Sequence, residues 1–257
     1  MHTKRAAETF VMSATTGYVL VVIFIATIVR STIGFGEALV AVPLLALRIP
    51  IAVAAPFVVA VSVVVAGANL VADWRHVEFR AARGLVLSSF IGLPIGIYML
   101  RAVDDRIVKL LLGATIIGVS LYSLVRGAAA SLRAENKVSL IGAGVLSGIL
   151  GGAYGMNGPP LAIYGTLRGW SPRQFRATLQ GYFLVASVAG LIGYRVAGVW
   201  NAAASHYLLI SLPCVLGGIL VARRINSGAE DPRFFRAVYG GLIAIGLILI
   251  VQSALAG

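Results

Sequence analysis

Residues 33–39 read IGFGEAL, and residues 154–161 read YGMNGPPL. Each stretch interrupts an apolar run that is long enough to enter a bilayer, and each contains glycine or proline, the residues that break or restart a helix. A polypeptide at membrane depth cannot leave backbone N–H and C=O groups facing lipid. Two matched interruptions therefore predict irregular backbone that lines a protected cavity, which is where transporters hold their substrates.

The composition indicates a protein that lies almost entirely in a membrane. Of the 257 residues, 59% are hydrophobic and 12% are charged, whereas soluble domains carry about 25% charged residues. Apolar runs occupy nearly all of the sequence, so we expect one membrane-embedded domain over residues 1–257. The net charge of +12 does not indicate a nucleic-acid partner, because the basic residues gather in short loops between apolar runs.

Ten apolar segments are predicted to be helical. Two of them, at 36–47 and 158–167, are too short to cross a bilayer, and at about 1.5 Å per residue they reach roughly half of a ~30 Å core. Most of the others have the length of about 17–25 residues that a crossing needs. These longer segments are 12–33, 51–71, 84–100, 107–125, 138–154, 177–194, 206–222 and 237–255.

The two halves of the sequence resemble each other. A shift of 122 residues superposes Gly36 on Gly158 without a gap and aligns both interruptions. We therefore predict two repeats, about 12–126 and 138–256, each with about five helical segments and one Gly/Pro-broken short half-helix. The alternative is coincidence in a sequence rich in Ala, Leu and Gly.

Basic residues indicate how the repeats are oriented. Four loops, at 75–83, 126–137, 168–176 and 223–236, carry 13 of the 21 basic residues. If the chain changes direction five times in each repeat, all four basic loops lie on one face of the membrane. If the number of direction changes in each repeat is even, the first two loops oppose the last two, and the excess of basic residues on one face nearly vanishes. An odd count inverts one repeat relative to the other. The predicted fold is therefore an all-α polytopic membrane protein of two inverted repeats, with the basic loops in the cytoplasm.

The interruptions have the chemistry of an anion site. A helix that restarts after Gly36 or Gly158 presents unpaired backbone N–H groups and the positive end of its dipole. An oxyanion is a natural partner for these groups. Glycines such as Gly34 let the backbone approach a ligand closely, and Pro159 in a first helical turn loses no needed hydrogen bond. The alternative is that the glycines only allow close helix packing.

Charged residues inside apolar segments are few, and each is costly. Arg30 and Glu37 flank the first interruption, and two roles stay open: a structural ion pair, or an anion-binding arginine beside a proton-carrying glutamate. Arg176 and Gln180 open the helix after the second short segment, where Arg176 is either a ligand or an interfacial residue. The candidate substrate-binding residues are Arg30, Gly34, Gly36, Glu37, Asn157, Gly158, Pro159, Arg176 and Gln180.

The sequence argues against an intramembrane enzyme. It contains no His, Cys, Asp or Glu cluster with metal-ligand spacing, and we expect neither a metal nor a cofactor. With Cys214 as the single cysteine, no intramolecular disulfide is possible. A passive anion channel is a stronger alternative to a transporter, because broken helices also build channels.

Several motifs resemble those of the sulfite exporter TauE/SafE family. Residues 34–36 (GFG), followed by 43–45 (PLL), resemble its first signature. Residues 148–161, followed by 172–178 (PRQFRAT), resemble its second. The loop at 73–77 (DWRHV) is similar to one that these proteins carry after an early helix. The resemblance covers nearly the whole chain. One departure is Glu37, because family members often continue the first interruption with glycine.

The resemblance implies a multi-pass permease of the bacterial inner membrane that moves small anions, including sulfite and organosulfonates. We expect export by alternating access, with an ion gradient as a candidate driving force. Another small carboxylate or sulfur compound is the alternative substrate. The expected partners are a small anion and the lipid bilayer, and the sequence does not predict an oligomeric state.

Overall fold

The computed structural model describes residues 2–126, 137–225 and 232–255, and this part of the chain consists of helices without any strand. The all-α prediction is confirmed. Six helices, α1, α3, α4, α6, α8 and α9, are long and apolar enough within the described residues to cross a membrane. The elements are α1 (His2–Ile33), α2 (Glu37–Ala46), α3 (Ile51–Asp73), η1 (Trp74–His76), α4 (Phe79–Ala102), α5 (Asp105–Arg126), α6 (Lys137–Tyr154), α7 (Gly158–Leu167), α8 (Pro172–Val196), α9 (Ala202–Ile225) and α10 (Pro232–Leu255).

The two short helices are present where the sequence predicts them. Helices α2 and α7 have ten residues each, and their bounds agree with the predicted short segments to within one residue. The longer helices extend beyond the apolar runs, so the predicted starts of α4, α8 and α10 were wrong by five residues, that of α9 by four and that of α1 by ten. In α8 the cause is a capping box, in which the Ser171 hydroxyl accepts a hydrogen bond from the Gln174 N–H. Hydropathy alone misses such a start, because arginines follow the cap.

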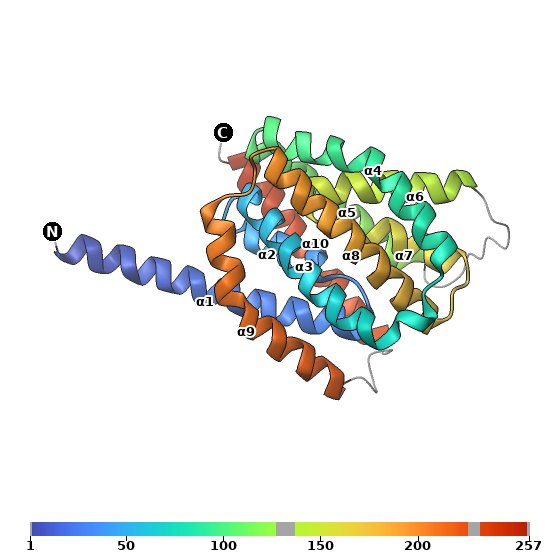
Figure 1. Ribbon diagram of the computed structural model, residues 1–257. Coiled ribbons are helices and arrows are strands. Elements are labelled where there is room, and N and C mark those ends of the chain that lie inside the picture. The colour runs from blue at the N-terminus through green and yellow to red at the C-terminus, as the bar shows by residue number, and fades with distance from the viewer. Residues whose placement is uncertain (1, 127–136, 226–231, 256–257) are drawn as a thin grey trace.

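Helix α2 packs against α1 after the first interruption and runs back along it. The Tyr18 hydroxyl, about four turns before the end of α1, donates to the carbonyl of Leu44 near the end of α2 (2.7 Å). Helix α7 likewise packs against α6. In Figure 1 the N-terminal part of α1 projects away from the other helices, whereas its C-terminal part lies within the bundle beside α2.

Each half of the chain packs against the other in reciprocal pairs. Helix α4 packs along α6, and α1 packs along α9. Helix α3 lies beside α8, and α5 lies beside α10 (Figure 1). If α1–α5 are matched in order with α6–α10, the α4–α6 pair is the counterpart of the α9–α1 pair. The pair α3–α9 likewise has an exchanged counterpart in the pair α8–α4.

Helices α3 and α8 cross the centre of the molecule in opposite directions. The hydroxyls of Ser62 and Ser187 are hydrogen-bonded to each other near the middle of the two helices (3.3 Å). Just beyond the end of α3, the Glu78 N–H donates to the Thr178 hydroxyl in the first turns of α8 (3.0 Å). Phe57 is one of several fully buried residues of α3, so this helix forms part of the core and brings Ser62 to the interior.

Candidate functional site

The first interruption depends on two glycines with left-handed backbone. Gly34 follows the last residue of α1 with φ +97°, and Gly36 precedes α2 with φ +99°. Residues other than glycine rarely adopt such a positive φ angle. A Cβ atom on Gly34 would also lie 2.6 Å from Cγ of Arg176. Glycine is therefore required at position 34 both by its dihedral angle and by the close approach of α8.

The second interruption is held by the helix that precedes it. Gly155 has φ +69°, and the Ser147 hydroxyl donates to the carbonyl of Asn157 (2.9 Å). The Asn157 side chain lies against Gly151, where a Cβ atom would be 2.5 Å from its Oδ1. The helix α6 thus keeps the backbone of residues 155–157 in a fixed, irregular path.

The two interruptions, far apart in the sequence, line one small cavity. Its volume is about 20 Å³, which holds about one water molecule. Both polar and apolar residues line it, and both helix starts, Glu37 of α2 and Gly158 of α7, contribute. The lining residues are Arg30, Phe35, Gly36, Glu37, Ala38, Leu39, Ser62, Gly155, Met156, Asn157, Gly158, Pro159 and Phe183.

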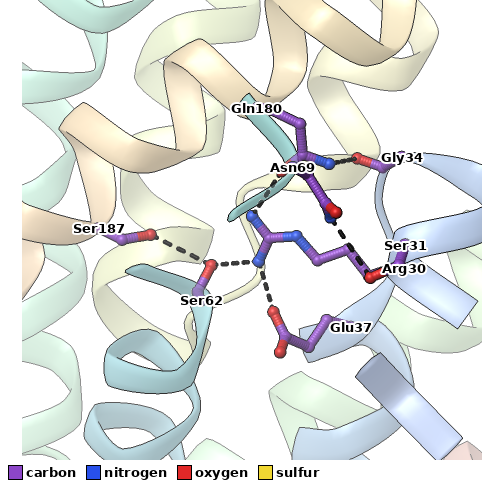
Figure 2. A network of polar contacts seen from close by, with 8 residues as sticks. All are labelled: Arg30, Ser31, Gly34, Glu37, Ser62, Asn69, Gln180 and Ser187. Atoms are coloured by element: carbon purple, nitrogen blue, oxygen red, sulfur yellow. Dashed lines mark hydrogen bonds and ion pairs between the residues drawn. The ribbon is translucent and has the colours of Figure 1, made fainter. Parts of the chain in front are cut away.

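Arg30 is the central side chain of this cavity. Its side chain is only 3% exposed and forms an ion pair with Glu37, which is 2% exposed. The guanidinium also donates to the Ser62 hydroxyl and to Oε1 of Gln180 (3.1 Å), and it lies 4.8 Å from the ring centre of Phe183. Figure 2 shows the guanidinium among its hydrogen-bonding partners, which are Glu37 of α2, Ser62 of α3 and Gln180 of α8.

Gln180 connects this cluster to the first interruption. Its Oε1 accepts from Arg30, and its Nε2 donates to the carbonyl of Gly34 (2.9 Å). On the other side, Ser62 accepts from Arg30 and is bonded to Ser187 (3.3 Å). The network in Figure 2 therefore joins α1, α3 and α8 around one cation. Arg30 is held in place by its partners and does not point freely into space.

Two polar atoms of the cluster have no hydrogen-bond partner in the part of the chain that the structure describes. Nε of Arg30 and Oε1 of Glu37 are buried and form no hydrogen bond with the described residues. Buried polar groups normally find a partner, which is a ligand or a water molecule where the protein supplies none. One of these atoms is a donor and the other an acceptor, and both residues line the cavity. The site can therefore bind a small polar group.

The helix starts differ in what they offer to a ligand. In α2 the carboxylate of Glu37 occupies the first turn, where the helix dipole favours a negative charge. In α7 Pro159 and Pro160 follow Gly158, and proline has no N–H to donate. Helix α7 therefore presents fewer backbone N–H groups at its start than α2 does. The guanidinium of Arg30 is the principal donor group of the cavity.

The structure brings most of the candidate residues together. Six of the nine line the cavity: Arg30, Gly36, Glu37, Asn157, Gly158 and Pro159. Gln180 and Gly34 lie next to it and are bonded to each other. Arg176 is half-buried, packs its stem against Gly34, and is absent from the lining residues. Its contact is thus with the interruption and not with the cavity.

Three residues of the network around Arg30 are not among the candidates predicted from the sequence. Ser62, Phe183 and Ser187 lie in the middle of long apolar helices, where a serine reads as an ordinary small residue. The signal that could have found Ser62 and Ser187 is their placement near the centres of α3 and α8. Among described residues, no group of three or more His, Cys, Asp or Glu side chains is placed to hold a metal ion.

Comparisons with known proteins point in one direction. The family model for the sulfite exporter TauE/SafE matches residues 19–249. The chain is also similar to a protein of Cupriavidus necator described as a probable sulfite/organosulfonate exporter TauE. The two are 25% identical over 207 residues, which cover 79% of this chain and 80% of the relative. No solved structure matches the chain.

Proposed function

This chain belongs to the sulfite exporter TauE/SafE family, whose members are membrane transporters and not enzymes, and from that premise we propose that it exports a small oxyanion such as sulfite or an organosulfonate. The proposed location is the inner membrane of a bacterium. The observation that carries the proposal is the buried Arg30 in a cavity formed by both helix interruptions.

An oxyanion suits this cavity for physical reasons. Arginine presents several donors in a fixed, planar arrangement that matches the oxygens of a carboxylate or a sulfonate. Nε of Arg30 has no partner among the described residues, whereas the terminal nitrogens bond to Glu37, Ser62 and Gln180. An incoming anion takes the unused donor first and then competes with Glu37 for the others. The Glu37 carboxylate thus occupies the position of the substrate when no anion is bound.

The small volume of the cavity supports a closed step of the proposed cycle for this conformation. A space of about 20 Å³ accepts about one water molecule and is too small for sulfite. Binding therefore requires the two interruptions to move apart. Phe35, between the two glycines, lies against Gly158, so a separation of the interruptions enlarges the cavity at this contact.

Alternating access by two inverted repeats is the proposed mechanism. Its support is the exchange of helix neighbours between α1–α5 and α6–α10, together with the opposite directions of the counterparts α3 and α8. The ends of the broken helices also correspond at an offset of 121 residues, from Ile33 to Tyr154 and from Glu37 to Gly158. The sequence shift of 122 differs from this by one residue. Rocking one repeat against the other opens the central cavity to each side in turn.

Topology provides a first test. We expect cysteines placed at His76 and Ile225, both exposed, to lie in the cytoplasm, because basic loops stay inside. In a Cys214→Ala background, both should resist an impermeant thiol reagent in intact cells. A cysteine at Ala203, at the opposite end of α9, should be labelled. Opposite labelling of the first two positions contradicts the inverted arrangement.

Glu37 is the proposed carrier of a coupled proton, since it is the carboxylate that an anion displaces. We expect Glu37→Gln to keep sulfite transport, because the amide oxygen still accepts from Arg30, but to abolish the response to an imposed pH gradient. Uptake into proteoliposomes with and without the gradient measures this. Glu78→Gln, outside the cavity, is the control and should respond like the unmodified protein. An unchanged response of Glu37→Gln excludes the role.

A binding screen tests the proposed substrate class. Purified protein is titrated with sulfite, sulfoacetate, acetate and chloride. We expect sulfite or sulfoacetate to bind at least tenfold more tightly than chloride, because only an oxyanion can use several donors of Arg30. Preferential binding of acetate assigns a carboxylate substrate instead. Equal, weak binding of all four contradicts an oxyanion site.

A further inference from the structure

A second hollow lies on the outer side of α8, away from the anion cavity. It is a groove of about 530 Å³, within the range of about 300–1,000 Å³ that is usual for ligand sites. The groove is formed by the end of α3, η1 with the loop after it, the first half of α4 and the middle of α8. The lining residues are Leu70, Trp74, Val77, Phe79, Ala82, Arg83, Val86, Leu87, Gly181, Leu184 and Val185.

The walls of the groove are apolar and face outwards. Phe79 is 67% exposed, and Trp74, Leu87 and Val185 are exposed to a similar degree. In α4 the lining residues recur on one helix face from Phe79 to Leu87, which at about 1.5 Å per residue gives a length of about 12 Å. Gly181 keeps the floor open, since a Cβ atom there would first meet Val77 at 3.6 Å. The shape and surface suit one hydrocarbon chain.

Basic residues of α4 border this apolar groove. Arg83 lines it, and Arg80 and Arg83 together line an adjoining hollow. Both arginines are exposed, as is the neighbouring Arg75. None of these three takes part in an ion pair with another described residue. A hydrocarbon-sized groove therefore opens onto uncompensated positive charge, at the level where α3 ends and α4 begins.

We propose that this groove binds an anionic phospholipid, with an acyl chain between α4 and α8 and the phosphate at Arg80 and Arg83. Charge complementarity favours an anionic lipid. A zwitterionic lipid fills the apolar part of the groove equally well, but its headgroup is attracted less strongly by the arginines. The basic loops are expected on the cytoplasmic side, where the membrane surface carries anionic lipids. The inference does not depend on the transported substrate.

The bound lipid contacts the same stretch of α8 that builds the anion cavity. Gly181, Leu184 and Val185 face the groove. Their neighbours Gln180 and Phe183 contact Arg30 on the other side of the helix. The lipid is thus placed to support the helix that positions Arg30.

Trp74 offers a direct measurement of the occupant. In a Trp170→Phe, Trp200→Phe protein, Trp74 is the remaining tryptophan. Its fluorescence is recorded in vesicles that mix phosphatidylglycerol and phosphatidylcholine, with bromine on the chains of one lipid at a time. We expect brominated phosphatidylglycerol to quench the Trp74 fluorescence at least tenfold more effectively per lipid than brominated phosphatidylcholine at the same mole fraction. The double variant Arg80→Gln, Arg83→Gln should remove this preference, because each arginine is expected to contribute a factor of about five to it.

Variants that fill the groove show whether the lipid preference comes from the groove or only from the positive surface charge of the protein. Gly181→Phe and, independently, Val185→Phe should abolish the preference although all arginines remain. Val188→Phe, exposed on the same helix but outside the groove, should keep it. Native mass spectrometry of the unaltered protein should likewise retain phosphatidylglycerol, and this should be lost in both groove variants. Equal quenching by the two lipids, or a preference that survives both fillings, overturns the proposal.

Discussion

Replacing Arg30 alone by methionine is expected to destabilise the protein by about 3–5 kcal/mol, because it leaves the buried Glu37 carboxylate without its cation. Glu37→Met should cost a similar amount for the opposite reason. The double variant should recover much of the loss, since it removes both charges together. Thermal unfolding of the three purified variants in detergent measures these differences.

The double variant then separates structure from function. If Arg30 is the anion ligand, Arg30→Met with Glu37→Met folds but loses sulfite affinity by at least about a hundredfold, since it removes several charge-assisted hydrogen bonds. If the two residues only fix the interruption, the folded double variant binds sulfite like the unmodified protein. Unchanged stability and unchanged binding in all three variants exclude both roles.

Gly148→Leu is expected to prevent stable packing of α4 against α6. A Cβ atom on Gly148 would lie 2.2 Å from the carbonyl oxygen of Ser89, and one on Gly152 would lie 2.4 Å from that of Leu93. Backbone stands directly against backbone here, as in membrane helices that associate through small residues. A leucine at position 148 has no room, and we expect a loss of more than about 3 kcal/mol.

The same helix supplies a matched control for this change. Gly142 has no atom within 4 Å of a Cβ position, so Gly142→Leu should fold normally. The yield of monodisperse protein and its melting temperature measure both variants. Equal stability of Gly148→Leu and Gly142→Leu contradicts the close α4–α6 contact. Close helix packing thus explains the glycine at position 148 but not the one at position 142 of the same helix.

The positions of the two interruptions were predictable from local chemistry. Gly34 and Gly155 adopt backbone angles that other residues avoid, so the helices end where the sequence says they must. The ten helical segments follow from hydropathy in the same way. Helix ends such as the start of α8 were not predictable from hydropathy, because Ser171 and Gln174 define it through hydrogen bonds.

The side-chain network around Arg30 was only partly predictable. The sequence places Arg30 and Glu37 seven residues apart and leaves their roles open, whereas the fold brings them into contact. Ser62 and Gln180 reach the same guanidinium from 32 and 150 residues away. Contacts over such distances depend on how α1, α3 and α8 pack together. Arg176 is an example of the opposite kind. The sequence makes it a candidate ligand because it lies in a family-like motif, but its side chain packs against Gly34 and does not line the cavity.

We expect counterflow to show that both interruptions form one anion site in a carrier that opens to one side at a time. Liposomes containing the purified protein are loaded with excess unlabelled sulfite and diluted into a trace of radiolabelled sulfite. A carrier should accumulate label transiently above equilibrium, and the folded Arg30→Met, Glu37→Met protein should not. Flux of sulfite through the unmodified protein without any such overshoot would contradict the account and assign a passive channel.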